Sequence, residues 1–511
     1  MKFLLVLCCV LWGAQSYKLL FMCPMPSPSH FFLIFRLAKE FADRGHQVTV
    51  ISPFPQKTPI KNYRDIQILE VIDSFEEIKK ILFNMADKGP LDNLDLIYRA
   101  GLGATTQILE NKNVQSLINS NETFDAFIIE QFTSEALLGI GHRFGAPIIL
   151  MSGFGTTNLL NHFVANPAPS SYVWNVVMKP STTYKNFWDR MHNFLLSNYI
   201  DFQREQYFMP EHRKLFKKYF NSDVELDDIV YNVSLILGNS HVSLYKAVPQ
   251  VPNIINIGGF HVGPLKELPT DLQNFLDDAK NGVILFALGT NLKSSDLKPE
   301  IRDAFLNAFS KIKQKVLWKF EKQLDNLPEN VKIMEWLPQQ EVLAHPNVRA
   351  FITHGGMLSV VETVYFGVPM IGIPIFGDQK SNIATVAKRG YCINLPFTEL
   401  TEEKLSKALN EILNNPKYRK NAQKLSQIMH DRPVKALDEA VFWIEHVIRH
   451  GGAPHLRTDA LNLKWYQREM IDIIGFLLGV VLLFLGSILF ILKTMLGWMF
   501  CGRSPVKQKL N

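Results

Sequence analysis

Cysteine is scarce in this chain, and the few cysteines do not suggest a disulfide framework. Five occur in 511 residues, and Cys8, Cys9 and Cys501 lie in or beside the apolar ends of the chain. Cys23 and Cys392 remain, one in each half. Neither a disulfide scaffold nor a Cys-x-x-Cys zinc site is therefore expected.

Charge of one sign is also scarce. The formal net charge is +6, and no cluster of Lys and Arg interleaved with aromatic residues occurs. This distribution argues against a nucleic-acid partner. Hydrophobic residues make up 47% of the chain and charged residues 20%, which is typical of a globular protein with additional apolar segments. At 511 residues the chain is too long for one compact core, so we expect two domains.

The start of the chain is typical of a targeting segment. Residues 1–16 contain Lys2, an apolar run and the small-x-small ending Ala14-Gln15-Ser16, which together predict a secretory signal peptide cut before Tyr17. A first buried strand or a membrane anchor is the weaker interpretation, because the run is too short to span a bilayer.

A second apolar stretch lies near the other end of the chain. Ile473–Leu492 contains no charged residue and is long enough to cross a bilayer. Trp465 and Lys493 flank it as anchors at the membrane interfaces. We therefore expect a transmembrane helix over 471–493 that contacts the lipid bilayer, with a buried core helix as the alternative.

The charges after this segment predict its orientation. The basic tail over 494–511 is expected in the cytosol by the positive-inside rule, which places 17–470 in the lumen as a single-pass type I protein. Lys507 and Lys509 resemble a dilysine signal, which predicts the endoplasmic reticulum membrane. If the large segment is lumenal, the candidate N-glycosylation sites are Asn121 and Asn232.

The first half of the chain predicts a Rossmann-like α/β domain. A strand over Lys18–Cys23, a helix that begins at His30 and a strand over His46–Ser52 form a β-loop-α-β unit. The unit lacks G-x-G-x-x-G, which argues against a dinucleotide. Further along, we expect a strand over Asp125–Glu130, a helix over Ser134–Phe144 and a strand over Pro147–Met151.

The second half predicts another domain of the same kind. Proline and glycine become frequent over Pro249–Pro264, which marks a linker. The elements expected after it are strands over Val283–Leu288, Val316–Phe320 and Val331–Glu335 and a helix over Lys298–Lys313. The fold class is therefore α/β, with Rossmann-like domains over 17–250 and 251–460 that face a cleft.

The most informative stretch runs from Trp336 to Asn382. Its centre is a strand over Arg349–Thr353 that ends at His354-Gly355-Gly356 and is followed by a helix over Met357–Phe366. The glycines let the backbone approach a ligand, and the free N–H groups at the helix start favour an anion.

Side chains around this unit suit a phosphorylated sugar ligand. Glu362 can accept hydrogen bonds from two sugar hydroxyls, and Trp336 offers a flat face to a base. Asp378 and Gln379 follow the next buried strand, Met370–Ile373, at the edge where open α/β sheets bind ligands. The other candidates are the amide of Gln339, the ring of His354 and the hydroxyl of Ser359. An ordinary βα unit with a core Trp and a capping Ser is the alternative.

The order W-x-P-Q, H-G-G, a glutamate and D-Q resembles the signature of the UDP-glycosyltransferase family. The resemblance implies a GT-B architecture, a helix over Leu437–Ile448 that packs back on the first domain, and UDP-sugar as the co-substrate. It implies that Trp336 and Gln339 hold the nucleoside, His354, Gly356 and Ser359 the diphosphate, Glu362 the ribose, and Asp378 and Gln379 the transferred sugar. The loop L-G-T-N resembles the second phosphate-side loop of the family and adds Thr290. Leu358 departs from the asparagine that vertebrate and plant relatives usually carry, and its pairing with Ser359 looks arthropod-like.

A general base is expected from the other domain. His30 lies at the carboxyl edge of the first strand and at a helix start, where the helix dipole favours a neutral imidazole. The resemblance places the base of the family at this position, and a capping or solvent-facing histidine is the alternative. Family members orient this base with an aspartate, whereas this chain has the longer Glu130 at that position. Glu135 is a second candidate for the orienting carboxylate, and the third possibility is that neither residue has this role.

These features together predict an inverting, metal-independent transferase. The chain contains no Asp-x-Asp pair, so no metal or other cofactor is expected. UDP-glucose is favoured over UDP-glucuronate, because no basic residue can be assigned to a donor carboxylate. The expected acceptors are small lipophilic hydroxyl compounds, as in detoxification, and Phe154–Phe220 is expected to face either the acceptor or a membrane.

Two other functions remain open at this point. One is a binding protein that keeps the cleft and has lost catalysis through Glu130 and Leu358. The other is a different nucleotide-sugar enzyme of the same architecture, such as an epimerase or a lipid-linked sugar transferase. A homo-oligomer is possible, and no short pattern encodes the shape of an acceptor pocket.

Overall fold

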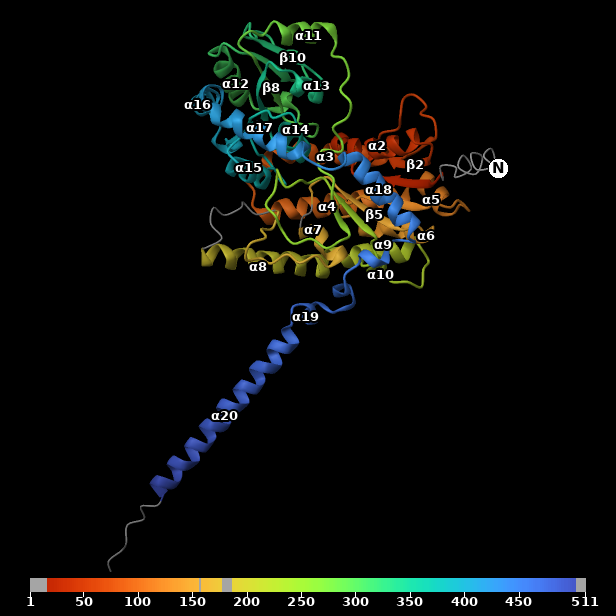
Figure 1. Ribbon diagram of the computed structural model, residues 1–511, viewed down its shortest axis with the longest axis vertical. Coiled ribbons are helices and arrows are strands. Elements are labelled where there is room, and N and C mark those ends of the chain that lie inside the picture. Colours follow the sequence, from red (N-terminus) through yellow and green to blue (C-terminus); the bar gives the residue numbers. More distant parts are fainter. Residues whose placement is uncertain (1–15, 156–157, 177–185, 502–511) are drawn as a thin grey trace, which may run out of the picture. The chain divides into compact units, whose positions relative to one another are not determined.

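The computed structural model describes residues 16–155, 158–176 and 186–501. Residues 1–15 of the predicted signal peptide and the predicted dilysine signal at Lys507 and Lys509 therefore lie outside the described residues. The chain divides into two compact units, Met1–Arg457 and Thr458–Asn511 (Figure 1).

The first unit contains two parallel β-sheets in its described part. The seven-stranded sheet has the order β3-β2-β1-β4-β5-β6-β7, and the six-stranded sheet has the order β10-β9-β8-β11-β12-β13. The strands of the first sheet are β1 (Lys18–Met22), β2 (Gln47–Ser52), β3 (Tyr63–Gln67), β4 (Ala126–Glu130), β5 (Ile148–Ser152), β6 (Leu235–Gly238) and β7 (Ile254–Asn256). Those of the second are β8 (Val283–Ala287), β9 (Lys315–Lys319), β10 (Val331–Met334), β11 (Val348–Thr353), β12 (Met370–Gly372) and β13 (Cys392–Asn394).

Helices cover both sheets, as the continuous apolar runs of the strands require. Those before the second sheet are α2 (Pro28–Asp43), α3 (Glu70–Ile81), α4 (Pro90–Glu110), α5 (Lys112–Ile118), α6 (Leu138–Arg143), α7 (Asn158–Asn161), α8 (Phe187–Gln203), α9 (Met209–Tyr219) and α10 (Leu226–Val230). Those of the second half are α11 (Thr270–Asp277), α12 (Pro299–Ser310), α13 (Gln339–Ala344), α14 (Met357–Tyr365), α15 (Gln379–Lys388), α16 (Glu402–Asn414), α17 (Pro416–His430) and α18 (Ala436–Arg449). Short 3-10 turns include η1 (Leu82–Asp87), η2 (Glu135–Leu137), η3 (His162–Val164), η5 (Ser294–Asp296), η6 (Phe397–Glu399) and η7 (Pro454–Leu456).

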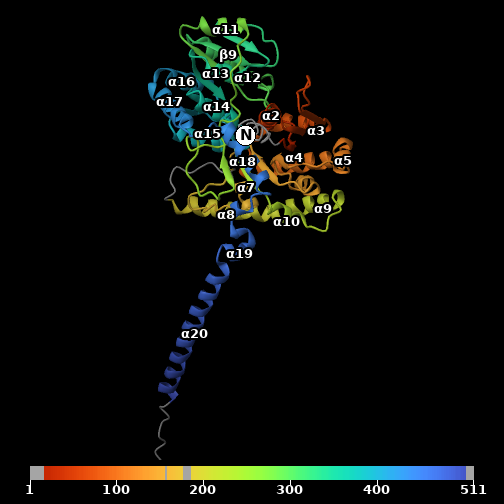
Figure 2. The ribbon, with the colours of Figure 1, turned by 45° about the vertical axis from the view of Figure 1, so that its right-hand side comes forward.

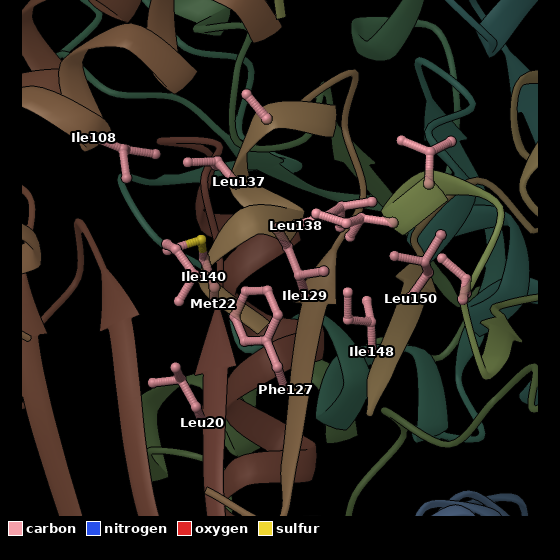
Figure 3. Packing of buried hydrophobic residues seen from close by; sticks show 14 of the residues in the cluster. Leu20, Met22, Ile108, Phe127, Ile129, Leu137, Leu138, Ile140, Ile148 and Leu150 are labelled. Carbon is pink, nitrogen blue, oxygen red and sulfur yellow. The ribbon is translucent and has the colours of Figure 1, made fainter. Parts of the chain in front are cut away.

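Alternate residues of the first sheet pack on opposite faces. Leu20 and Met22 of β1 lie on one face, with Leu138 and Ile140 of α6. Figure 3 shows these side chains converging with those of β4 and β5. Residues on the other face include Leu19, Phe21, Val48, Val50, Ala126 and Ile128, which pack with α2. The first domain therefore has its core on both sides of the sheet.

Helix α18 also packs on this second face. Ala440, Val441 and Ile444 are fully or almost fully buried and belong to the same apolar cluster as Leu33 and Leu37 of α2. The chain thus returns from the second sheet to the first, where the predicted helix over Leu437–Ile448 was expected to pack.

Three boundaries differ from those read in the sequence. Helix α2 begins at Pro28 and not at His30, because proline is well suited to the first helical position. The helix expected over Ser134–Phe144 is divided into η2 and α6. Strand β7 is the last strand of the first sheet, although it lies inside Pro249–Pro264.

The aromatic-rich region is helical at both ends of its described part, whereas residues 165–176 form turns and irregular structure. Helices α8 and α9 are joined by η4 (Arg204–Phe208), one turn of π-helix. Helix α8 exposes several large apolar side chains, among them Phe187, Trp188 and Phe194. Leu160 and Arg204, in contrast, are buried.

The second unit contains η8 (Asp459–Asn462), α19 (Trp465–Arg468) and α20 (Ile471–Cys501). Helix α20 is uninterrupted in both Figure 1 and Figure 2. Within Ile471–Met499, an 18-residue window has a mean hydropathy of 2.8, so the length and composition of this segment allow it to cross a membrane. The helix is longer than the predicted span over 471–493.

Candidate active site

A cavity of about 1040 Å³ lies in the first unit, lined by residues of both halves. The first half contributes His30, Phe132 and Phe154, and the second half contributes loops at the carboxyl ends of its strands. The predicted donor residues that line it are Thr290, Trp336, Gln339, His354, Gly356, Ser359, Glu362, Asp378 and Gln379. The structure thus brings all of them into one cavity with His30.

His30 is held from behind by Glu130. The Nδ1 atom of His30 lies 2.8 Å from Oε1 of Glu130, which is fully buried at the end of β4. The extra methylene of Glu130, relative to the aspartate expected at this position, does not prevent the contact. The rings of Phe132 and Phe154 flank the imidazole at centroid distances of 5.4 and 5.6 Å.

The electrostatic environment of His30 differs from the expected one. Burial lowers the pKa of His30, but the carboxylates of Glu130 and Asp378 raise it by more than burial lowers it. The pKa of His30 therefore lies above the ordinary 6.5. The expectation that the helix start favours a neutral imidazole is therefore wrong in direction, because the contact with Glu130 stabilises the imidazolium.

Glu135, the second candidate partner of His30, lies elsewhere in the cavity. It is buried, and its Oε1 atom lies 3.8 Å from Nε of Arg204 and 4.0 Å from Nε2 of His162. The structure therefore pairs His30 with Glu130 and places Glu135 beside Arg204 and His162. The importance of Glu130 for catalysis stays a prediction.

The ring of His354 lies between two glycines. A Cβ atom on Gly289 would meet the ring at 2.5 Å, and a Cβ atom on Gly356 would meet Nε2 at 2.6 Å, closer than real contacts allow. Gly289 also has a φ of +83°, which favours glycine. Gly356 thus leaves space for the imidazole of His354. The sequence alone suggested a different reason for this glycine, namely the close approach of a ligand to the backbone.

His354 is neutral near pH 7. Burial, together with the positive charge of Lys319, lowers the pKa of His354 to about 4. Its Nδ1 atom lies 3.3 Å from the hydroxyl of Thr353. When Nδ1 accepts from that hydroxyl, Nε2 carries the proton and can donate to an anion at the start of α14.

Gln339, Ser359 and Glu362 form one hydrogen-bonded group. Nε2 of Gln339 donates to Oγ of Ser359 at 3.2 Å and to Oε2 of Glu362 at 2.5 Å. Nε2 of Gln340 donates to Oε1 of Glu362 at 2.9 Å. Each carboxylate oxygen keeps a lone pair for a ligand hydroxyl. Helices α13 and α14 thereby fix Glu362 in the cavity wall.

Trp336 presents an open face to the cavity. The residue is 61% exposed, and Nζ of Lys319 lies 5.7 Å from the centre of its ring. Lys319 also donates to the carbonyl of Gly289 at 3.0 Å and to Glu321 at 3.0 Å. A flat aromatic face beside a fixed positive charge suits a heterocyclic base and the phosphates attached to it.

Asp378 and Gln379 stand at the start of α15. Asn382 donates to Asp378, and burial raises the pKa of Asp378 to about 6. Oε1 of Gln379 accepts from the backbone N–H groups of Ile375 at 2.9 Å and Phe376 at 3.1 Å. Only the amide nitrogen of Gln379 therefore remains for a ligand.

Contacts between the two halves join the walls of the cavity. Oγ of Ser27 donates to Oδ1 of Asn291 at 2.9 Å, and N of Gly377 donates to Oδ1 of Asn93 at 2.9 Å. Leu358 packs against the apolar cluster that contains α2. This packing is what Leu358 provides in place of the polar contact expected from asparagine.

Several site residues were not found from the sequence. His261 is fully buried, and its Nε2 atom lies 3.6 Å from Oε1 of Glu362, although it comes from the segment expected to be a linker. Lys319 ends a buried strand, and a charged residue at that position could have indicated a site residue. Gln340 directly follows Gln339, and the doubled glutamine was the signal there.

Comparisons with known proteins agree with this geometry. The family model described as UDP-glucoronosyl and UDP-glucosyl transferase matches residues 18–501. UDP-glycosyltransferase UGT5 from Dactylopius coccus is 35% identical over 92% of this chain and 90% of its own length. UDP-glucosyltransferase 2 from the same organism is 33% identical over 98% of this chain and 97% of its own. Human UDP-glucuronosyltransferase 2B10 is 32% identical over 89% of this chain and 88% of its own length.

Solved structures share the fold. The calicheamicin glycosyltransferase CalG4 aligns with a TM-score of 0.55 at 18% identity, over 85% of this chain and 100% of its own. The spinosyn forosaminyltransferase SpnP aligns with a TM-score of 0.56 at 15% identity, over 85% of this chain and 100% of its own. At these identities the likeness shows the fold alone, which is the GT-B arrangement of two Rossmann-like sheets.

Proposed function

Since the chain belongs to the UDP-glucoronosyl and UDP-glucosyl transferase family, we propose that this glycosyltransferase moves glucose from UDP-glucose to a hydroxyl group of a small lipophilic acceptor. The observation that carries this proposal is the position of His30. Its imidazole, backed by Glu130, opens into the same cavity as the donor motif. A base on one wall and a donor site on the other provide what glycosyl transfer requires.

On the donor side, we assign the diphosphate to the start of α14. The N–H groups there, the ring of His354 and the hydroxyls of Ser359 and Thr290 can stabilise the charge that develops as UDP leaves. Glu362 would hold the ribose, with Trp336 against the uracil.

The donor assignment can be tested at Gly356. In Gly356→Ala, the added methyl group meets Nε2 of His354 and displaces the ring. We expect UDP affinity to fall by about 10–100-fold, because a hydrogen bond to a charged ligand is lost. Isothermal titration with UDP measures this. Gly103→Ala is the matched control, since a Cβ atom there meets nothing within 4 Å. A Gly356→Ala protein that binds UDP as tightly as the wild type would contradict the assignment.

On the acceptor side, His30 would remove the proton of the attacking hydroxyl. Glu130 on Nδ1 leaves Nε2 available to the acceptor and stabilises the imidazolium that forms. Attack opposite to the departing UDP inverts the anomeric centre, so an α-linked donor gives a β-glycoside.

The surroundings of Asp378 support glucose as the transferred sugar. No Lys or Arg in the described part of the chain forms an ion pair with Asp378, whose hydrogen-bond partner is Asn382. An ionised Asp378 would repel the carboxylate of glucuronate and can accept hydrogen bonds from glucose hydroxyls. The donor is therefore proposed to be neutral.

A UDP-release assay tests the function. We expect the detergent-solubilised protein to release UDP from UDP-glucose only when a phenol acceptor is present, and more slowly from UDP-glucuronate. Chelation by EDTA should leave the rate unchanged, because hydrogen-bond donors and not a metal are proposed to hold the diphosphate. UDP binding without release across a broad acceptor panel would favour a non-catalytic binding protein.

The location proposed from the sequence is the membrane of the endoplasmic reticulum, with α20 as the anchor. Asn121 is exposed and is the better glycan acceptor, because the side-chain oxygen of Asn232 accepts from Arg457. An endoglycosidase H shift that Asn121→Gln removes would support a lumenal domain. A protein that carries no glycan at Asn121 would not fit this topology.

A further inference from the structure

A buried polar group lies in the first-domain part of the cavity and has no task in the proposed transfer. Tyr98 of α4, Glu135 of η2 and Arg204 of η4 all line the cavity. Glu135 is 3% exposed and Arg204 7%. The sequence indicates Glu135 only as a candidate partner for His30, and it carries no signal for the other two residues. We call these three side chains the polar cluster.

The polar cluster has unused hydrogen-bonding capacity. Among the described residues, the hydroxyl of Tyr98, Oε2 of Glu135, and Nε and Nη2 of Arg204 have no hydrogen-bond partner. The closest approach between Glu135 and Arg204 is 3.8 Å, which is too long for a hydrogen bond. Buried polar atoms are nearly always paired, so donors and an acceptor without partners, on side chains that line a cavity, indicate a ligand.

The guanidinium of Arg204 is fixed before any ligand arrives. Its Nη1 atom donates to Glu205, which also accepts from Arg213 at 3.1 Å. Arg213 is in turn paired with Asp227 at 2.7 Å. The π-helical turn that begins at Arg204 is of a kind found frequently at functional sites. This chain of ion pairs pre-organises the cluster for recognition.

Many of the first-domain side chains that line the cavity with His30 and the polar cluster are apolar or aromatic. Phe132 and Phe154 contact the ring of His30, and Tyr98 stacks on Phe208 with centroids 4.5 Å apart. Further apolar lining comes from Leu96, Ile97, Ala100, Leu159 and Leu160. Such walls suit a flat hydrophobic body.

We propose that the polar cluster binds a second hydroxyl group of the acceptor, at the end of the molecule away from the hydroxyl that is glycosylated. A hydroxyl both donates and accepts, so it can donate to Oε2 of Glu135 and accept from Arg204 or Tyr98. A purely apolar end would leave these groups unpaired. The proposal rests on the proposed function and names its acceptor class as flat, apolar compounds with two well-separated hydroxyls.

Matched acceptor pairs test this class. The pairs are 4-phenylphenol with 4,4′-dihydroxybiphenyl, and 2-naphthol with 2,6-dihydroxynaphthalene, each with UDP-glucose. After correction for two equivalent hydroxyls, the wild type should prefer the diol by about 10–100-fold in kcat/KM, mainly through KM, because a hydrogen bond to a charged buried group is gained.

Two conservative variants identify the residues. Tyr98→Phe and Glu135→Gln should each reduce the diol preference by about tenfold, and retained UDP affinity shows that the variants fold. Tyr199→Phe is the matched control, since its hydroxyl is on a side chain that is 43% exposed and does not line the cavity. It should keep the full preference.

The outcomes separate this inference from the proposed function. If no acceptor supports UDP release, the proposed function fails. Equal use of both members of each pair by the wild type, turnover of monohydroxy phenols alone, or better use of a carboxylate-bearing phenol overturns the inference while the transferase stands. A diol preference that survives in both variants overturns it as well.

Discussion

His30→Ala lowers acceptor-dependent UDP release by about 10²–10⁴-fold, the range expected when a general base is removed. The imidazole opens into the cavity and is held at 2.8 Å by Glu130, and no other side chain in the described residues shares that contact with Glu130. Without the imidazole of His30, the acceptor hydroxyl must attack while it still carries its proton. Steady-state UDP release with saturating UDP-glucose and a phenol measures the effect on kcat.

The same variant should still bind UDP, because no donor assignment involves His30. Titration with UDP should give an affinity within about twofold of the wild type. His142→Ala is the matched control: His142 contacts Ser222 at 3.1 Å and does not line the cavity, so its removal should leave turnover near the wild-type level. A His30→Ala protein that keeps more than about a tenth of the activity would remove His30 as the base.

Glu130→Gln should lower kcat by about 10²–10⁴-fold and change the pH dependence of kcat/KM. The neutral imidazole is the active form, so activity falls as the pH drops through the pKa of His30. Glu130 raises that pKa against the effect of burial, which lowers it. Removing the charge therefore moves the acid limb of the profile to lower pH, whereas the maximum rate decreases.

Glu130→Asp provides the control for this second prediction. It keeps a carboxylate, so the acid limb should stay above that of the Gln variant and the loss of turnover should be smaller. A profile of Glu130→Gln that coincides with the wild type would show that Glu130 does not control the ionisation of His30. A lower rate with an unshifted acid limb would assign Glu130 a purely structural role.

Much of the architecture follows from local sequence. The strands β1, β4, β5, β8 and β11 lie close to the predicted runs, because a parallel strand buried on both faces reads as a continuous apolar segment. The stretch from Trp336 to Gln379 was also readable, since its helix start, glycines and polar side chains are close in the chain. Its predicted donor residues line one cavity in the structure.

Other features of the site could not be predicted, because long-range packing creates them. His261 comes from a segment without a motif and reaches Glu362 only through the fold. Glu135 lies five residues after Glu130, yet it faces Arg204, and no local pattern indicates this partner. The pKa of His30 likewise depends on a neighbour brought by another strand.

The role of Gly356 shows the same limit. Its φ of −60° is open to any residue, so the backbone alone does not explain the glycine. The reason is the ring of His354, which occupies the space of a Cβ atom. Side-chain placement of this kind is a three-dimensional property.

The anomeric configuration of the product tests the central claim most directly. The solubilised wild-type protein is incubated with α-linked UDP-glucose and a phenol that supports UDP release, and the glycoside is examined by proton NMR. A single displacement assisted by His30 predicts a β-glucoside formed in equal amount to the released UDP. An α-glucoside, or release of UDP without a glycoside, would contradict it.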